Sequence, residues 1–275
     1  MGLYVQFMNR AWGRERGHHE REEMRMLLGN KVAVIYGGGV ICEAVATAFA
    51  REGARICLAG RNQSRLDVVA GAVGAAGGRA ETAVLDALDE RAVDAHADAV
   101  AAAAGSIDIS MNLISLGDVQ GIPLVDMTLA DFEQPVLTAL RSTFLTSRAV
   151  ARHMIRRGGG VVLMFGGYGD PPRGYHIGGL QVAFQAVEAF RRNLAAELGP
   201  HGVRVVTLQT SGIVDSIPAD FDGRDALAAQ FASATMLGRA ATLADVGNVA
   251  CFAASDWARS LTSTAINMTC GARPD

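Results

Sequence analysis

Short apolar runs alternate with longer amphipathic stretches along most of the chain. Seven runs have the length and the β-branched or aliphatic composition of buried strands, at residues 32–36, 55–59, 81–85, 107–113, 161–165, 203–208 and 265–269. Helical spacing of apolar residues fills the intervals, most clearly at residues 90–104, 129–157 and 178–198. This repeated strand–helix–strand order predicts an α/β fold with one parallel sheet and helices on both faces.

The N-terminus does not follow this pattern. Residues 1–28 contain the charged run NRAWGRERGHHEREEMRM and no apolar core of a secretory signal. We therefore expect an N-terminal extension at residues 1–28, followed by a single domain at residues 29–275. The extension is either a solvated arm, a segment upstream of a true start near Met24 or Met26, or a helix that packs on a partner subunit.

Composition and net charge limit the kinds of molecule that the protein is expected to bind. A net charge of −3 gives no basic field for nucleic acid or an anionic membrane, and no segment approaches the roughly 20 unbroken apolar residues of a membrane span. The four cysteines include no Cys-x-x-Cys pair, which indicates buried thiols rather than a metal site or a disulfide framework. These features predict a cytoplasmic protein with a small-molecule ligand, no metal, and no nucleic-acid or membrane partner.

Ligands of parallel sheets lie beyond the carboxyl ends of the strands. Gly37, Gly38 and Gly39 join the first strand to the first helix, where glycines let the backbone approach a pyrophosphate. The alternative is a tight turn that needs a positive φ. Arg61 follows the second strand, where a guanidinium suits the 2′-phosphate of NADP(H) and an acidic residue would suit NAD. A solvated surface arginine is the other interpretation.

Several longer stretches resemble the short-chain dehydrogenase/reductase family. They are KVAVIYGGG, AFAREGARICLAGR, IDISMN, RRNLAAELGPHGVRVVTL and TSTAINMTCGARPD, and they extend over residues 29–275. The resemblance implies a Rossmann-like, doubly wound parallel seven-stranded sheet with helices on both faces. It also implies a homodimer or homotetramer assembled through the two long helices.

The same resemblance implies a set of cofactor-binding positions. They comprise the phosphate-binding turn and contacts to the adenosine phosphate, adenine and carboxamide, and they fall on Gly37, Gly39, Ile41, Arg61, Asp86, Asn112, Gly212 and Ser216. Three departures remodel this cleft. The glycine turn is one residue short with Cys42 in place of its last glycine, Leu113, Ile114 and Ser115 replace Asn-Ala-Gly, and Ser211 replaces a proline.

The catalytic positions that the resemblance implies hold no proton donor. Aligned on AVEAFRRNLAAELGP, the family's Tyr-x-x-x-Lys falls on Leu180 and Phe184, its serine on Gly167 and its supporting asparagine on Ala139. In the family the tyrosine protonates the carbonyl oxygen and the lysine lowers the tyrosine's pKa. A shifted alignment would still need a lysine, and the only one, Lys31, begins the first strand at the wrong end of the sheet. The family's ordinary mechanism is thereby excluded.

Two interpretations are open for the apolar residues at the predicted catalytic positions, and two for the loop that precedes them. Leu180 and Phe184 either pack a helix that has lost its active site or line an apolar ligand pocket. In the loop GGYGDPPRGYHIGG, Tyr168, Tyr175 or His176 is a candidate for the missing acid, or the loop has ordinary polar tips. Residues 221–234 resemble the family's lid and are mostly Ala, Leu and Phe, which favours an apolar substrate.

Three functional hypotheses follow. The first is an atypical NADP(H)-dependent oxidoreductase that acts on an apolar carbonyl or enoyl substrate by a non-standard mechanism. The second is a non-redox cyclase, isomerase or dehydratase, which would turn over substrate without consuming nicotinamide. The third is a catalytically silent binding subunit, which would form a hetero-oligomer with an active paralogue.

Overall fold

Seven parallel strands form the centre of the protein, of which this computed structural model describes residues 26–167 and 175–273. The strands lie in the order β3-β2-β1-β4-β5-β6-β7, and every pairing is parallel. Their bounds are β1 Val32–Tyr36, β2 Arg55–Gly60, β3 Ala80–Val84, β4 Ile109–Asn112, β5 Gly160–Gly167, β6 Val203–Thr210 and β7 Thr264–Asn267. The predicted doubly wound seven-stranded sheet is confirmed.

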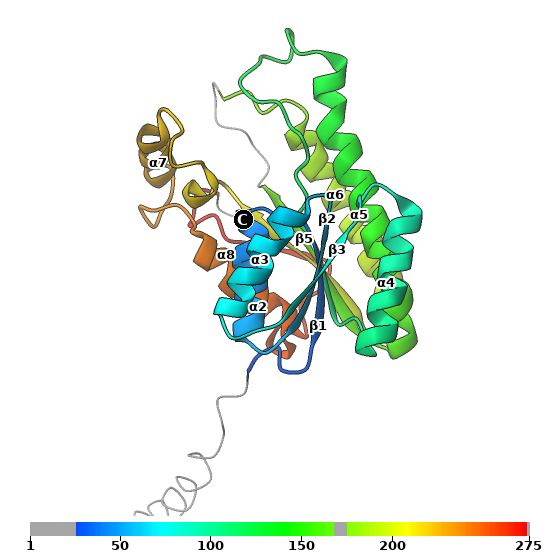
Figure 1. Ribbon diagram of the computed structural model, residues 1–275. Coiled ribbons are helices and arrows are strands. Elements are labelled where there is room, and N and C mark those ends of the chain that lie inside the picture. The colour runs from blue at the N-terminus through cyan, green and yellow to red at the C-terminus, as the bar shows by residue number, and fades with distance from the viewer. Residues whose placement is uncertain (1–25, 168–174, 274–275) are drawn as a thin grey trace, which may run out of the picture.

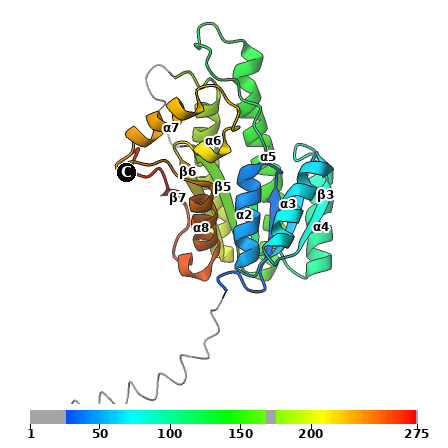
Figure 2. The same cartoon turned by 60° about the vertical axis from the view of Figure 1, so that its left-hand side comes forward.

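Helices cover both faces of this sheet (Figures 1 and 2). One face carries α2 (Val40–Arg51), α3 (Gln63–Ala75) and α8 (Leu243–Ala254), and the other carries α4 (Glu90–Ala104), α5 (Leu129–Arg157) and α6 (Leu180–Leu198). The short helix α7 (Arg224–Ser233) stands apart, beyond one end of the sheet (Figure 1). Each face therefore has its own apolar core, and α7 belongs to neither.

Alternation along the first strand shows how the two cores are separated. Ala33 and Ile35 face the core under α2, α3 and α8, whereas Val34 and Tyr36 face the core under α4, α5 and α6. Leu28 is fully buried against the first of these cores, so the packed domain starts before residue 29. None of the helices among the described residues is long and apolar enough to cross a membrane.

The helices differ in whether a side chain caps the first turn. Side-chain caps start four of the helices that follow strands or loops: Asn62 for α3, Asp89 for α4, Thr128 for α5 and Thr242 for α8. By contrast, the N-cap residues of α2 and α6 are Gly39 and Gly179, and no side chain caps either helix. The first-turn N–H groups of α2 and α6 are thus left without a side-chain acceptor.

Candidate functional site

The glycine turn between β1 and α2 has the shape of a phosphate cradle. Gly37 has a φ of 141°, and a Cβ there would lie 2.7 Å from the carbonyl oxygen of Leu113. Its N–H donates to the carbonyl oxygen of Ala59, 2.8 Å away. A Cβ at Gly39 would meet nothing within 4 Å, so the space over the start of α2 is open. Open space, an uncapped first turn and close-packed glycines fit a pyrophosphate group.

Cys42 occupies the first turn of α2, in the position of the motif's last glycine. Its side chain is buried, and this burial raises the pKa of the thiol to about 12. Ile41 beside it packs against the first core. Cys42 is therefore a packing residue, as the sequence predicts, and not a nucleophile.

Two arginines of the β2–α3 junction lie on one side of the glycine turn. Arg61 directly follows β2 and is exposed, and Arg65 is exposed in the first turn of α3. A Cβ at Gly38 would lie 3.2 Å from the Cβ of Arg65, so α3 starts against the turn itself. The sequence analysis missed Arg65; its signal was its place shortly after Arg61, in the segment that follows the second strand.

The polar residues after β3 and β4 lie at the same carboxyl edge and are held by local hydrogen bonds. The Oδ1 atom of Asp86 accepts from the N–H of Leu88 at 2.9 Å. Asn112 donates from Nδ2 to Oγ of Ser142 at 2.8 Å and accepts from the N–H of Ile114. These bonds fix both side chains at the rim of the cleft, where their contact with a cofactor stays a prediction.

The turn after β6 is covered by the lid. A Cβ at Gly212 would lie 2.7 Å from Cε2 of Phe231, so α7 packs directly on this turn. Ser216 donates its hydroxyl to the carbonyl oxygen of Ile213 at 2.7 Å, which closes a short 3₁₀ turn. The predicted lid thus contacts the strand end through one aromatic ring.

Two of the positions that the resemblance predicts to be catalytic, residues 167 and 184, are in contact. A Cβ at Gly167 would lie 2.5 Å from Cε2 of Phe184, and one at Gly166 would lie 3.5 Å from Cδ1 of the same ring. The phenyl ring therefore fills the space that a side chain at residue 167 would need. Phe184 and Leu180 are both half-buried, so they pack on the fold and also present carbon atoms outward. Ala139 is buried within α5.

Of the three candidate acids, Tyr175 and His176 are described, and Tyr168 lies outside the described residues together with Arg173. Tyr175 is exposed and donates its hydroxyl proton to Oε1 of Gln120 at 2.6 Å. The carbonyl oxygen of His176 accepts from the N–H of Gly121 at 2.6 Å. These bonds join the loop after β5 to the loop after β4, and they engage the proton of Tyr175 with an amide.

A buried tyrosine and a small cavity lie near the candidate site, and both are closed to a substrate. Tyr36, at the end of β1, is fully buried edge-on against His96, and burial raises the pKa of its hydroxyl. A cavity of about 20 Å³, which is room for one water, is lined by Asn112, Ser110, Thr143 and Ser147 among other residues. Neither place is open to a substrate.

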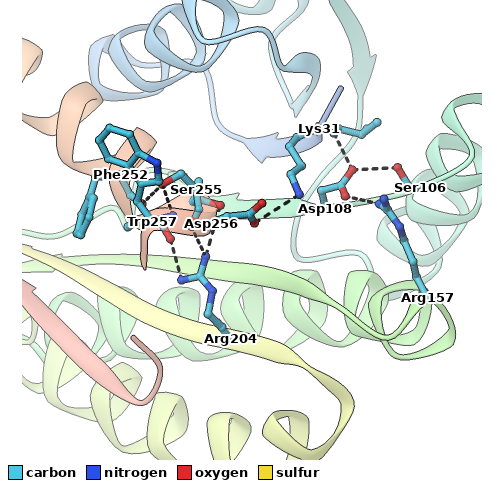
Figure 3. Close-up of polar contacts among 12 residues, drawn as sticks. Lys31, Ser106, Asp108, Arg157, Arg204, Phe252, Ser255, Asp256 and Trp257 are labelled. Carbon is cyan, nitrogen blue, oxygen red and sulfur yellow. Dashed lines mark hydrogen bonds and ion pairs between the residues drawn. The ribbon is translucent and has the colours of Figure 1, made fainter. Parts of the chain in front are cut away.

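The single lysine lies at the opposite end of the sheet. Lys31 precedes β1, and its Nζ atom is 3.7 Å from Oδ1 of Asp256 (Figure 3). The strands run away from this edge toward the glycine turn, because all their pairings are parallel. The prediction that Lys31 is at the wrong end to serve the site is confirmed.

With this geometry in place, comparison with known proteins identifies the family. The family model described as enoyl-(acyl carrier protein) reductase matches residues 39–273. The uncharacterized oxidoreductase YxbG of Bacillus subtilis is 30% identical over 239 residues, which cover 83% of this chain and 86% of the relative. D-threitol dehydrogenase of Mycolicibacterium smegmatis is 32% identical over 192 residues, which cover 69% and 73%. The chain belongs to the short-chain dehydrogenase/reductase family of oxidoreductases.

Solved structures agree on the fold. A short-chain type dehydrogenase/reductase of Mycobacterium marinum has a TM-score of 0.78 and 25% identity, with 91% of this chain and 98% of that chain covered. An NAD⁺-bound xylitol dehydrogenase has a TM-score of 0.79 and 22% identity, with 89% and 99% covered. This second likeness concerns the fold alone.

Proposed function

We propose that the protein is an NADP(H)-dependent oxidoreductase that acts on an apolar substrate without the family's tyrosine and lysine. The observation that carries this proposal is the glycine turn, with an open, uncapped α2 start and two exposed arginines of the neighbouring β2–α3 junction. The helix start and backbone N–H groups favour a pyrophosphate, and Arg61 with Arg65 offers a second anion site one strand away. Two anion sites at this spacing match a dinucleotide with an extra phosphate better than NAD(H).

The roles of the chain's residues toward this cofactor follow from their positions. Gly37 and Gly39 would hold the pyrophosphate by the backbone, and Asp86 and Asn112 would border the adenosine and nicotinamide halves. The lid would close over the carboxamide end through the contact of Phe231 with Gly212. The cofactor supplies the redox chemistry, and the protein binds and orients both reactants.

An apolar substrate fits the surfaces around this cleft. In this proposal the half-buried Phe184 and Leu180 form its floor, at the positions where the resemblance predicts the family's polar catalysts. Exposed apolar side chains also gather on the segments that follow β4 and β6: Leu124, Val125, Phe221, Met236 and Leu237. Such carbon-rich walls bind ligands by removing apolar area from water.

We further propose that the protein assembles as a homodimer or homotetramer through α5 and α6. Leu137, Leu140 and Phe144 are exposed on one stripe of α5, and the ring of Phe144 meets that of Phe190 on α6 edge-on at 6.1 Å. Leu137→Asp should dissociate the assembly in light-scattering measurements. A stable monomer before mutation, or a hetero-oligomer with a paralogue in the native host, would contradict it.

Calorimetric titration with NADPH and NADH tests the cofactor proposal. Arg61→Ala and Arg65→Ala should each weaken NADPH binding about tenfold, because each removes a charge-assisted hydrogen bond, and should leave NADH binding unchanged. Arg79→Ala is the matched control, since Arg79 is equally exposed but precedes β3 at the far edge. Absence of binding by any nicotinamide nucleotide would overturn the proposal.

Turnover of a substrate without NADPH consumption would instead identify a non-redox enzyme. Tight NADPH binding with no turnover of any substrate would point to a silent subunit.

A further inference from the structure

Two aromatic side chains are exposed at the end of α8, at the amino edge of the sheet, where the strands begin. Trp257 is 77% exposed and Phe252 is 38% exposed. The hydroxyl of Ser255 joins their backbones, because it donates to the carbonyl oxygen of Phe252 at 2.8 Å and accepts from the N–H of Trp257 at 3.2 Å (Figure 3). Arg204 donates to the carbonyl oxygen of Ser255 at 3.1 Å. The two rings therefore form an exposed apolar surface on a backbone that side chains hold in place.

The chain enters the described part of the fold at the same edge. The Nζ atom of Lys31 lies 3.7 Å from Oδ1 of Asp256, the residue before Trp257 (Figure 3). Met26 packs against the turn after α2, where a Cβ on Gly53 would lie 2.8 Å from its Sδ atom. The segment that precedes Met26 therefore joins the fold at the edge that carries the two aromatic rings.

The sequence of that segment contains a set of apolar residues at helical spacing. Residues 1–25 lie outside the described residues. Six apolar residues among them fall in two neighbouring rows spaced by four: Leu3, Phe7 and Ala11, and Tyr4, Met8 and Trp12. This spacing predicts one apolar face on a helix. A helix of about ten residues is marginal in water by itself, so such a face needs a surface to pack against.

Length and charge allow this face to reach the rings of the same chain. Residues 13–25 connect it to Met26 and are mostly charged. A segment of that length spans about 20 Å as a helix and at most about 45 Å when extended. Residues 1–12 carry one charged side chain, Arg10, and no carboxylate, so they bring no like charge to the exposed Asp256 beside Trp257.

We propose that residues 3–12 dock on Phe252 and Trp257 of their own chain, with the apolar face of the segment against the two rings. The docked segment removes both rings from water and occupies a surface where a second copy of the chain could otherwise bind. The docking concerns the edge opposite the glycine turn, so it does not depend on the proposed function.

The two tryptophans of the chain make the docking measurable. Trp12→Phe keeps an aromatic ring in the segment and leaves Trp257 as the single tryptophan. Adding Phe7→Asp and Met8→Asp to this full-length chain should undock the segment, shift the Trp257 emission about 10 nm to the red and raise its quenching by acrylamide at least about threefold. Equal emission and equal quenching before and after the two substitutions would overturn the proposal.

The control adds the same charge on the other side of the segment. At helical spacing, Gln6 and Asn9 lie opposite the apolar face. Gln6→Asp combined with Asn9→Asp should therefore leave the emission and quenching of Trp257 unchanged in the Trp12→Phe chain. A red shift equal to that of the apolar-face variant would show that charge alone moves the segment, and would contradict the assignment.

The reverse experiment follows the segment from its own tryptophan. Trp257→Phe keeps a ring at the end of α8 and leaves Trp12 as the single tryptophan. Adding Phe252→Asp should expose Trp12, shifting its emission about 10 nm to the red. Phe221→Asp is the control, because Phe221 is also exposed but follows β6 at the carboxyl edge. A Trp12 emission that Phe252→Asp does not change, or that Phe221→Asp changes equally, would contradict the docking.

Cross-linking separates a segment of the same chain from a second copy. Benzoylphenylalanine in place of Met8 is photoactivated in protein assembled from ¹⁵N-labelled and unlabelled chains. Cross-links to the peptide that contains residues 252–259 should join only peptides of equal label. Mixed pairs would assign the segment to a partner chain and overturn the proposal. If the apolar-face variant keeps Trp257 shielded and dilution alone exposes it, a second copy covers the rings, and the proposal is also wrong.

Discussion

The amino and carboxyl edges of the sheet hold their polar groups in opposite ways. At the amino edge, the buried Asp108 accepts from the N–H of Val32 and the hydroxyl of Ser106, both at 2.9 Å, and pairs with Arg157 (Figure 3). Arg204 donates to the carbonyl oxygens of Ala253, Ala254 and Ser255 at the end of α8. Side chains there satisfy strand starts and helix ends within the chain itself.

The carboxyl edge leaves comparable backbone groups for something else. Gly39 stands before α2 without a side-chain cap and with open space beside it, and the ring of Phe184 fills the space beside Gly167. The difference teaches which polar groups serve the fold and which places are reserved for ligands. At the amino edge side chains bond to strand starts and helix ends, whereas the carboxyl edge also has a glycine turn and helix start whose backbone groups no side chain caps.

The largest expected effect is at the amino edge. Asp108→Ala removes the acceptor of a buried N–H and the partner of Arg157, and it should lower the free energy of unfolding by about 3 kcal/mol. Urea unfolding monitored by circular dichroism measures it. Asp118→Asn at the carboxyl edge is the control and should change stability by less than about 0.5 kcal/mol. Equal losses from the two variants would erase the contrast between the edges.

The contact of Phe184 with Gly167 predicts the next effect. Gly167→Ser places a side chain where the ring lies, and the overpacking should cost about 2 kcal/mol of unfolding free energy. Phe184→Ala in the same chain should relieve most of that cost, giving a coupling of at least about 1 kcal/mol in a double-mutant cycle. Additive losses would show that the ring does not occupy the space beside residue 167.

Helix α8 joins the two edges and predicts a smaller, pH-dependent effect. Arg239 and then the N–H of Thr242 hold the pKa of Asp245 at about 2, below its ordinary 3.8. A depressed carboxyl pKa stabilises the fold above about pH 4, and this contribution is lost as the pH falls toward 2. Since the pair is partly exposed, Asp245→Asn should cost only about 1 kcal/mol at neutral pH. A difference between variant and wild type that persists at pH 2 would contradict this assignment.

The smallest effect concerns thiol reactivity. Burial raises the pKa of Cys42 and of Cys251 to about 12, so neither should react with iodoacetamide in the folded protein at about pH 8. Cys270 is half-exposed and should be alkylated first. Mass spectrometry of digests identifies the labelled sites. Rapid labelling of Cys42 would mean that the glycine turn opens in solution.

Most of the fold was predictable because its elements have strong periodicity. The helix expected at residues 129–157 is α5 with the same bounds, although Pro135 lies inside it. Pro135 is the seventh residue of α5, beyond the first turn, so it removes one intrahelical N–H donor, a loss that the 29-residue helix tolerates. The strand expected at residues 107–113 is shorter, Ile109–Asn112, since a run of apolar residues does not reveal where pairing stops.

Only the site residues that directly follow a strand could be predicted from the sequence. Gly37, Asp86 and Asn112 lie at the carboxyl edge because parallel strands bring their ends together. The contact between Gly167 and Phe184 was not predicted, because no spacing rule joins residues on opposite sides of a loop. The bond from Tyr175 to Gln120 was missed for the same reason, as it joins loops 55 residues apart.

The contact between Phe184 and Gly167 limits which substitutions each position can accept. A serine restored at residue 167 alone would collide with the ring, and a lysine restored at residue 184 alone would find neither a serine nor a tyrosine to work with. Either substitution alone would therefore give a protein that is strained or has an incomplete set of catalytic side chains. The two positions are therefore coupled, because the residue at either one restricts which side chains the other can carry.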